Sequence, residues 1–290
     1  MIIFSYLLYY LVILPVSYLP FPLLYLFSDF LYLIFYSVFG YRKKVVYRNL
    51  RNSFPEKTEK EIDVIAKKFY HHFCDIVLET IKSFTISEKE MRKRMIFNNP
   101  ELIEDLYNNG KSVVILTGHF NNWEWASMSL SLHVKHKGLG IYLPLTNKFF
   151  NSKVLSSRCS FGMVMYGVRE TKSYFEKYKG VLSITGFVAD QAPSNVEKCH
   201  WMHFLNQDTP VFLGAERYAT LYNYPVVFGK ITKVKRGMYA VDAVMISEKP
   251  TEEKPSAITE RHTRFLEKQI IEKPEYWLWT HKRWKHKRQA

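Results

Sequence analysis

Hydrophobic positions divide the chain into a nearly uncharged N-terminal segment and a longer region in which short apolar runs alternate with helical patterns. Between residues 1 and 41 the only charged side chain is Asp29, and aliphatic or aromatic residues fill most other positions. The prolines of this segment predict two helical pieces, at roughly residues 1–14 and 23–39. The second piece is close to the ~20 residues needed to cross the hydrocarbon of a bilayer. We therefore expect residues 1–41 to form a membrane anchor and residues 42–290 to form one folded domain.

The sequence leaves the form of this anchor open. The segment could span the bilayer or lie as a helical hairpin in one leaflet, because a charged Asp29 is costly at the bilayer centre. A helix buried in a protein core is the third possibility. A signal peptide is excluded, since the apolar stretch is too long and lacks both a basic start and a small-residue cleavage site. Basic residues follow the segment and predict that the rest of the chain stays in the cytoplasm: Arg42, Lys43, Lys44, Arg48 and Arg51.

The region after the anchor has the pattern of an α/β protein. Residues 56–84 carry apolar side chains at steps of three and four, which predicts an amphipathic helix. Buried strands are predicted at residues 111–117, 138–143, 181–188, 225–230 and 239–246. Further helices are predicted at residues 121–133, 147–161, 170–179, 211–222 and 256–272. This alternation predicts a mixed, mostly parallel sheet flanked by helices.

Composition and charge narrow the classes of partner. The formal net charge of +14 attracts nucleic acid, anionic lipid headgroups or an acidic protein. No helix-turn-helix, RNP-like or zinc-finger pattern supports binding to nucleic acid. The three cysteines are far apart and form no metal-ligand cluster, so we expect no metal site. The aromatic residues, 16% of the chain, are concentrated in the N-terminal segment, which favours contact with a membrane.

The candidate catalytic pair is His119 and Glu124. His119 stands two residues beyond the predicted strand at 111–117 and just before the next predicted helix. Within one ideal helix, a spacing of five residues would place the two side chains about 140° apart. They can meet only if His119 lies in the turn, where Glu124 could hold Nδ1–H and leave Nε2 free to accept a proton. The spacing alone is weak, because a histidine at a strand end is usually structural.

The neighbouring residues carry a resemblance to a known family. His119-Phe120-Asn121-Asn122-Trp123-Glu124 resembles the HxxxxD/E motif of glycerolipid-type acyltransferases, in the form found in bacterial lipid A biosynthesis acyltransferases. Three further blocks resemble that family in order: residues 141–147 with Arg158 and 161–162, residues 189–191 with 204–206 and 209–214, and residues 273–285. Residues 49–55 are similar to the family's lead-in behind a membrane anchor. The resemblance therefore covers nearly the whole chain.

This resemblance implies transfer of a fatty acyl chain from a thioester to a hydroxyl of a membrane lipid at the cytoplasmic face of the inner membrane. A lipid A precursor is the expected acceptor, and a lysophospholipid, an aminolipid or another glycolipid is the alternative. Acyl carrier protein is the expected donor, with a coenzyme A thioester as the alternative, and no cofactor is expected. Direct attack by the hydroxyl needs no acyl-enzyme, which agrees with the absence of a GxSxG elbow or of a cysteine nucleophile near His119.

Other motif residues are candidates for binding the substrates. Arg158 could hold a phosphate or an oxyanion, because a guanidinium binds such groups bidentately, or it could be an ordinary surface or salt-bridged arginine. Asp190 and Gln191 follow the strand predicted at 181–188, at the end where α/β sheets bind ligands, unless they only cap the turn. Asn121 and Asn147 belong to the first and second motif blocks, and we include them as substrate-binding candidates.

The closing segment combines tryptophans with basic residues. Its members are Trp277, Trp279 and Trp284 with Lys282, Arg283, Lys285, Lys287 and Arg288. Such a combination suits a lipid headgroup interface and could also bind an acidic acyl carrier protein. The alternative is that the tryptophans belong to the core and only the basic tail is solvated.

Overall fold

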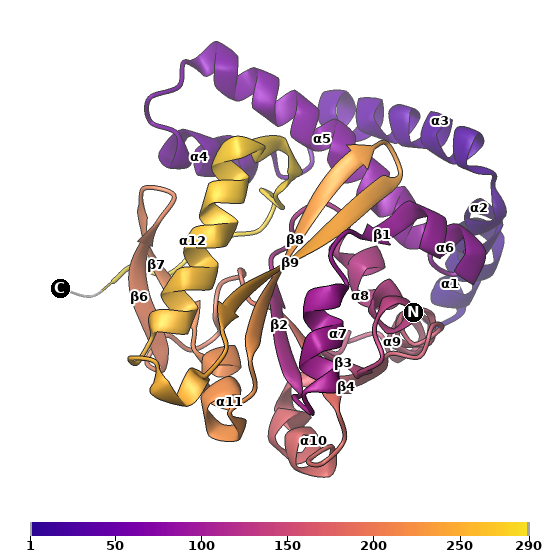
Figure 1. Cartoon of the computed structure of the whole chain (residues 1–290). Helices are drawn as coiled ribbons and strands as arrows, with labels where there is room; N and C mark the ends of the chain where they lie inside the picture. Colours follow the sequence, from indigo (N-terminus) through magenta and orange to yellow (C-terminus); the bar gives the residue numbers. More distant parts are fainter. Residues whose placement is uncertain (1, 289–290) are drawn as a thin grey trace.

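A seven-stranded sheet runs through the centre of the protein (Figure 1). The computed structural model describes residues 2–288. Its strands are β1 (Met95–Phe97), β2 (Val113–Thr117), β3 (Lys137–Tyr142), β4 (Val164–Gly167), β5 (Ser183–Val188), β8 (Val226–Lys235) and β9 (Met238–Ser247). Their order is β1-β9-β8-β2-β5-β3-β4, and only β8 and β9 pair antiparallel. The expected mixed, mostly parallel α/β sheet is therefore confirmed.

Helices cover both faces of this sheet, because its central strands are apolar on both sides. In β2, Val113 points to one face and Val114 and Leu116 to the other, and all three are fully buried. The first face packs against α7 (Glu101–Asn108) and α8 (Trp123–His133). The second packs against α11 (Gly214–Tyr222) and α12 (Ala257–Glu272), with α4 (Lys43–Ser53) and α5 (Glu59–Lys82) in the same core. Between residues 43 and 288 the structure also has α6 (Glu88–Arg94), α9 (Lys148–Arg158), α10 (Thr171–Lys177) and the short helical turns η3 (Val168–Glu170), η4 (Pro250–Glu252) and η5 (Pro274–Tyr276).

The five predicted strands correspond to β2, β3, β5, β8 and β9. Four other strands were not predicted. β1 and β4 have three and four residues, too few to show a periodic pattern. A separate antiparallel hairpin, β6 (Cys199–Phe204) and β7 (Gln207–Phe212), lies outside the main sheet. The helix predicted at residues 211–222 begins only at Gly214, because β7 pairs with β6 up to Phe212.

The N-terminal segment forms two helical rods joined at residues 19–20. The first consists of α1 (Ile2–Leu8), η1 (Tyr9–Ile13) and α2 (Leu14–Tyr18), and the second of α3 (Phe21–Tyr32) and η2 (Leu33–Val38). The first rod continues past the predicted end at residue 14. Pro15 lies in the first turn of α2, directly after the π-helical turn η1, and a helix tolerates proline in its first turn. Among the described residues, Phe21–Val38 is the helix long and apolar enough to cross a membrane. In Figure 1 this helix runs beside α5 rather than away from the rest of the chain.

Candidate active site

His119 lies in the turn between β2 and α8, as its spacing from Glu124 predicted. The turn is shaped by Asn121, whose φ of 53° is left-handed, a conformation that asparagine tolerates better than most residues. Asn122 then caps α8 by accepting a hydrogen bond from the backbone N–H of Trp125 at 2.9 Å. His119 therefore follows a rigid strand and precedes a capped helix, which fixes the position of its imidazole.

A buried carboxylate holds the imidazole of His119, and it belongs to Asp190. Nδ1 of His119 lies 2.6 Å from Oδ1 of Asp190, and the backbone N–H of His119 donates to Oδ2 at 2.9 Å. On the other side of the ring, Nε2 is 3.1 Å from the amide nitrogen of Gln191. Asp190 and Gln191 follow β5, which pairs directly with β2 up to Thr117 and Val188. A neutral imidazole with its proton on Nδ1 satisfies both contacts, since Nε2 then accepts from the Gln191 amide.

The prediction that Glu124 accepts the hydrogen bond from Nδ1 of His119 is wrong in this structure. Both carboxylate oxygens of Glu124 are bound by Arg158: Nε donates to Oε2 at 2.9 Å, and Nη2 donates to Oε1. Glu124 lies in the first turn of α8, and Arg158 lies at the end of α9, which packs against α8. The two motif residues therefore belong to two different pairs, His119 with Asp190 and Glu124 with Arg158.

The pKa values of Asp190 and Arg158 are both shifted in the direction that favours the charged form. Burial would raise the pKa of Asp190, but the charge and hydrogen bonds of His119 and the indole of Trp277 outweigh it and lower that pKa to about 2. Burial would lower the pKa of Arg158, but the charge and hydrogen bonds of Glu124 raise it above its ordinary value. Asp190 is therefore a carboxylate at neutral pH, able to stabilise an imidazolium, and Arg158 stays cationic.

The closing segment of the chain builds the wall behind His119. Trp277 donates its indole N–H to Oδ2 of Asp190 at 2.7 Å, and the backbone N–H of Leu278 donates to the carbonyl of His119 at 3.1 Å. Trp277 and Trp279 are buried, which contradicts their proposed place at a lipid interface and agrees with the core alternative. The exposed residues of this segment are basic: Lys282, Lys285, Lys287 and Arg288.

The two asparagines named from the motif blocks make structural contacts. Asn121 is buried and donates its amide to the carbonyl of Ile231 at 2.9 Å. Asn147 caps α9 by accepting from the backbone of Phe149 and Phe150 at 3.1 and 3.2 Å, and it donates to Oγ of Ser5 at 2.8 Å. These contacts account for Asn147 and for the amide nitrogen of Asn121, whose buried Oδ1 has no partner among the described residues. A role of either residue in substrate binding stays a prediction.

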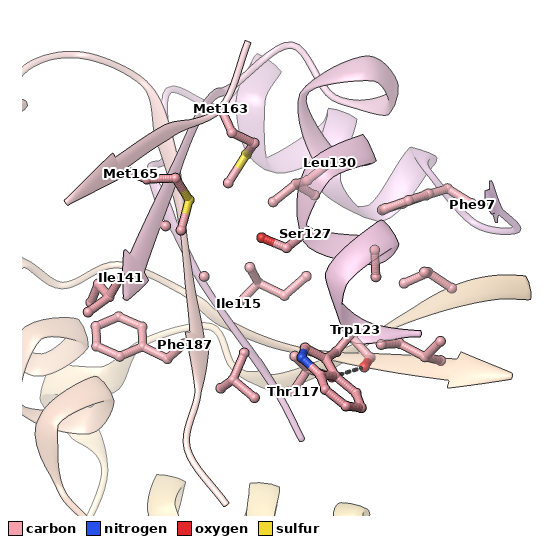
Figure 2. A pocket seen from close by; sticks show the side chains of 17 residues that line it. Phe97, Ile115, Thr117, Trp123, Ser127, Leu130, Ile141, Met163, Met165 and Phe187 are labelled. Carbon is pink, nitrogen blue, oxygen red and sulfur yellow. Dashed lines mark hydrogen bonds between the residues drawn. The ribbon is translucent and has the colours of Figure 1, made fainter. Parts of the chain in front are cut away.

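An apolar cavity opens beside the site, between α8 and the sheet (Figure 2). It contains about 570 Å³ of empty space, including the space at its mouth. The indole of Trp123, one of its lining residues, packs edge-on against the His119 ring with centroids 5.0 Å apart. The other side chains labelled in Figure 2 are mostly apolar and come from five strands, α8 and the residue before β4: Phe97, Ile115, Thr117, Ser127, Leu130, Ile141, Met163, Met165 and Phe187. Three glycines of the sheet also line the cavity, Gly140 on β3, Gly186 on β5 and Gly229 on β8.

The family model described as bacterial lipid A biosynthesis acyltransferase matches residues 1–286. A search of curated proteins gives no match to the chain.

Proposed function

The chain belongs to the bacterial lipid A biosynthesis acyltransferase family, and we propose that it transfers a fatty acyl chain from an acyl thioester to a hydroxyl of a lipid A precursor, with His119 as general base. The observation that carries this proposal is the His119–Asp190 pair. Asp190 engages Nδ1 at 2.6 Å and leaves Nε2 with a single amide contact, from Gln191. A base whose tautomer is fixed in this way can take a proton from an incoming hydroxyl.

This geometry supports a direct acyl transfer without an acyl-enzyme. The acceptor hydroxyl replaces the Gln191 amide at Nε2 and gives its proton to His119 while its oxygen attacks the thioester carbonyl. The negative charge of Asp190 stabilises the imidazolium that forms. When the tetrahedral intermediate collapses, the C–S bond breaks and the imidazolium returns the proton to the departing thiolate. The products are an ester and a free thiol, and no acyl-enzyme is formed.

Glu124 remains in the proposed catalytic machinery, with a revised role. Its two hydrogen bonds orient Arg158 and leave other N–H groups of the guanidinium free. We assign these groups to a phosphate of the acceptor or to the oxyanion of the intermediate, since guanidinium suits both. Glu124 therefore acts through Arg158 rather than through His119.

The cavity beside Trp123 suits the acyl chain. Its lining is almost entirely apolar, and its contact with His119 through Trp123 would place a thioester carbonyl near Nε2. Burial of each methylene contributes about 0.8 kcal/mol, so such a cavity can bind and select a fatty chain without polar contacts. The depth of the cavity would then limit the length of the chain.

An acidic acyl carrier protein is the donor that the charge distribution favours. The net charge is +14, and the four exposed basic residues of the closing segment follow directly after the residues that build the site. A coenzyme A thioester is the alternative donor. We place the reaction at the cytoplasmic face of the inner membrane, because the basic residues after the apolar N-terminal segment favour that orientation.

The lipid profile of a strain that lacks the gene tests the proposed acceptor. We expect mass spectrometry to find lipid A with one acyl chain fewer, restored by the wild-type gene and not by His119→Ala. An unchanged lipid A together with an altered lysophospholipid, aminolipid or glycolipid would instead support the alternative acceptors. No change in any of these lipids would refute the proposed activity.

A further inference from the structure

We infer that the apolar helix at Phe21–Val38 lies along the membrane surface with its outer face in one leaflet, and does not span the bilayer. The partner of this surface is the lipid of that leaflet. Three features support this placement: the packing of the helix, the exposure of its outer side chains and the residues at its two ends. It is independent of the reaction proposed above.

Polar contacts attach the inner face of this helix to α5 along most of its length. Tyr25 donates to Glu79 at 2.8 Å, and Ser28 donates to Asp75 at 2.7 Å. Near the other end of the helix, the hydroxyl of Tyr36 donates to Asp63 at 3.0 Å. The partners run backwards along α5 as the helix runs forwards, so the two helices are antiparallel neighbours.

The one charged residue of the segment is also attached to the folded domain. Asp29 pairs with Arg236 of the β8–β9 turn at 2.6 Å and with His71 of α5 at 2.9 Å. A spanning helix would carry these partners, together with the buried Asp75, into the hydrocarbon. Each charge placed at the bilayer centre costs at least about 2.5 kcal/mol, so a spanning arrangement would require the helix to detach from the domain.

The outer face of the same helix is apolar and exposed. Four of its apolar side chains share one side of the helix and are between 50 and 64% exposed: Leu26, Phe27, Phe30 and Leu33. The first rod adds further exposed apolar side chains, among them Ile3, Phe4, Leu7 and Leu11. An exposed apolar surface built from two helices is far beyond the scattered apolar residues normal on a soluble protein.

The ends of the helix identify lipid, rather than a second protein, as the partner. Tyr18 and Tyr41 flank it and are 69 and 40% exposed, and tyrosine is enriched at the headgroup level of membranes. Arg42, Lys43 and Lys44 follow directly, which suits anionic headgroups. An apolar face bounded by tyrosines and a basic cluster is the pattern of a helix that lies in the interface.

This placement also connects the membrane to the catalytic turn. Glu79, which accepts from Tyr25 of the membrane-facing helix, accepts in addition from the amide of Asn122 at 2.7 Å. Asn122 is the cap of α8 next to His119. A helix fixed in the leaflet therefore holds the active site at a defined distance from the lipid surface.

Fluorescence depth measurement distinguishes the two arrangements. Cys74, Cys159 and Cys199 are replaced by Ala, and single cysteines are introduced by Leu23→Cys, Phe30→Cys and Val38→Cys, all at exposed positions. Each is labelled with an environment-sensitive fluorophore in protein reconstituted into phosphatidylethanolamine–phosphatidylglycerol vesicles. Quenching by lipids with a doxyl group at a shallow or a deep carbon then gives the depth of each label.

We expect all three labels to lie at one shallow depth. A spanning helix would place the label at residue 30 about 10 Å deeper than the labels at residues 23 and 38, since each residue adds ~1.5 Å. That profile would overturn the inference, and so would the absence of quenching at all three positions. The matched control is Leu221→Cys, an exposed leucine on α11, which we expect to be unquenched. Quenching there equal to that on the helix would also contradict the proposed surface.

Discussion

Replacing Asp190 by Asn removes the carboxylate that holds His119 and keeps the size of the side chain. Asp190 accepts three hydrogen bonds, from Nδ1 and the backbone N–H of His119 and from the indole of Trp277, at 2.6, 2.9 and 2.7 Å. An asparagine offers one amide oxygen for these donors. It also favours the imidazole tautomer with the proton on Nε2, in which His119 cannot act as the base.

The expected loss of turnover is large. In Ser-His-Asp enzymes the same substitution lowers kcat by about 10⁴-fold, which is about 5 kcal/mol of transition-state stabilisation. The pKa of Asp190 falls from 3.8 to about 2 on folding, which corresponds to about 2 kcal/mol of stability present above pH 4 and lost as the pH falls towards 2. We therefore expect Asp190→Asn to lower kcat by about 10³- to 10⁴-fold, with a smaller change in KM, and to lower the thermal stability.

The assay is steady-state acyl transfer by purified protein in detergent, measured across pH, with thermal unfolding as the control for folding. Glu124→Gln is the matched comparison, since it removes a carboxylate that binds Arg158 and not His119. We expect Asp190→Asn to lose turnover at every pH tested, because its imidazole lacks the carboxylate partner, and Glu124→Gln to change mainly the KM for the lipid acceptor. A folded Asp190→Asn variant with nearly full turnover would refute the assignment of Asp190 as the partner of His119.

Three further predictions concern the surroundings of the pair. Arg158→Lys should raise KM for the lipid acceptor about tenfold with a smaller effect on kcat, because lysine cannot form the bidentate pair with Glu124; unchanged kinetics would contradict its binding role. Gly186→Ala should favour shorter acyl chains, because a Cβ at this position fits without a clash and narrows the cavity. The ratio of kcat/KM for a short and a long acyl donor should change about tenfold. An unchanged ratio would mean that the acyl chain binds elsewhere. Burial and the charge of Asp75 raise the pKa of Glu79 from 4.5 to about 7. Between these pH values the folded state holds a proton that the unfolded state releases. The free energy of unfolding should therefore fall by up to about 3 kcal/mol as the pH rises from 4.5 through 7. Glu79→Gln should lack this decline in thermal unfolding at pH 5 and 8, and an equal decline in both proteins would contradict the assignment.

Much of the fold is visible in local sequence. The strand predicted at residues 111–117 is a β-branched run between two glycines, and it becomes β2 because such a run fits a sheet covered on both faces. The helix predicted at 56–84 is confirmed as α5, where Thr58 and Glu61 form a capping box. The β6–β7 hairpin was missed because its short strands have no clear alternation of apolar and polar residues and pair only with each other.

The site could be predicted only in part, because the spacing of residues along the chain does not reveal which strands lie next to each other in the sheet. The five-residue spacing placed His119 in the turn before α8, and the end of the strand at 181–188 marked Asp190. Whether Asp190 or Glu124 reaches His119 depends on β5 lying next to β2, which brings together residues 71 positions apart. The role of Trp277 depends on a segment 87 positions from Asp190, so nothing in the local pattern separated a buried tryptophan from an interfacial one.

The most direct test of the central claim is the mass of the lipid formed by purified protein. Wild-type protein and His119→Ala are incubated with an acyl carrier protein thioester and an under-acylated lipid A precursor, and the lipids are analysed by mass spectrometry. The wild type should add one acyl group and release one free thiol per product, and folded His119→Ala should form at least about 10³-fold less product. Equal product from both proteins, or release of thiol without acylated lipid A, would contradict His119 as the base of a lipid A acyltransferase.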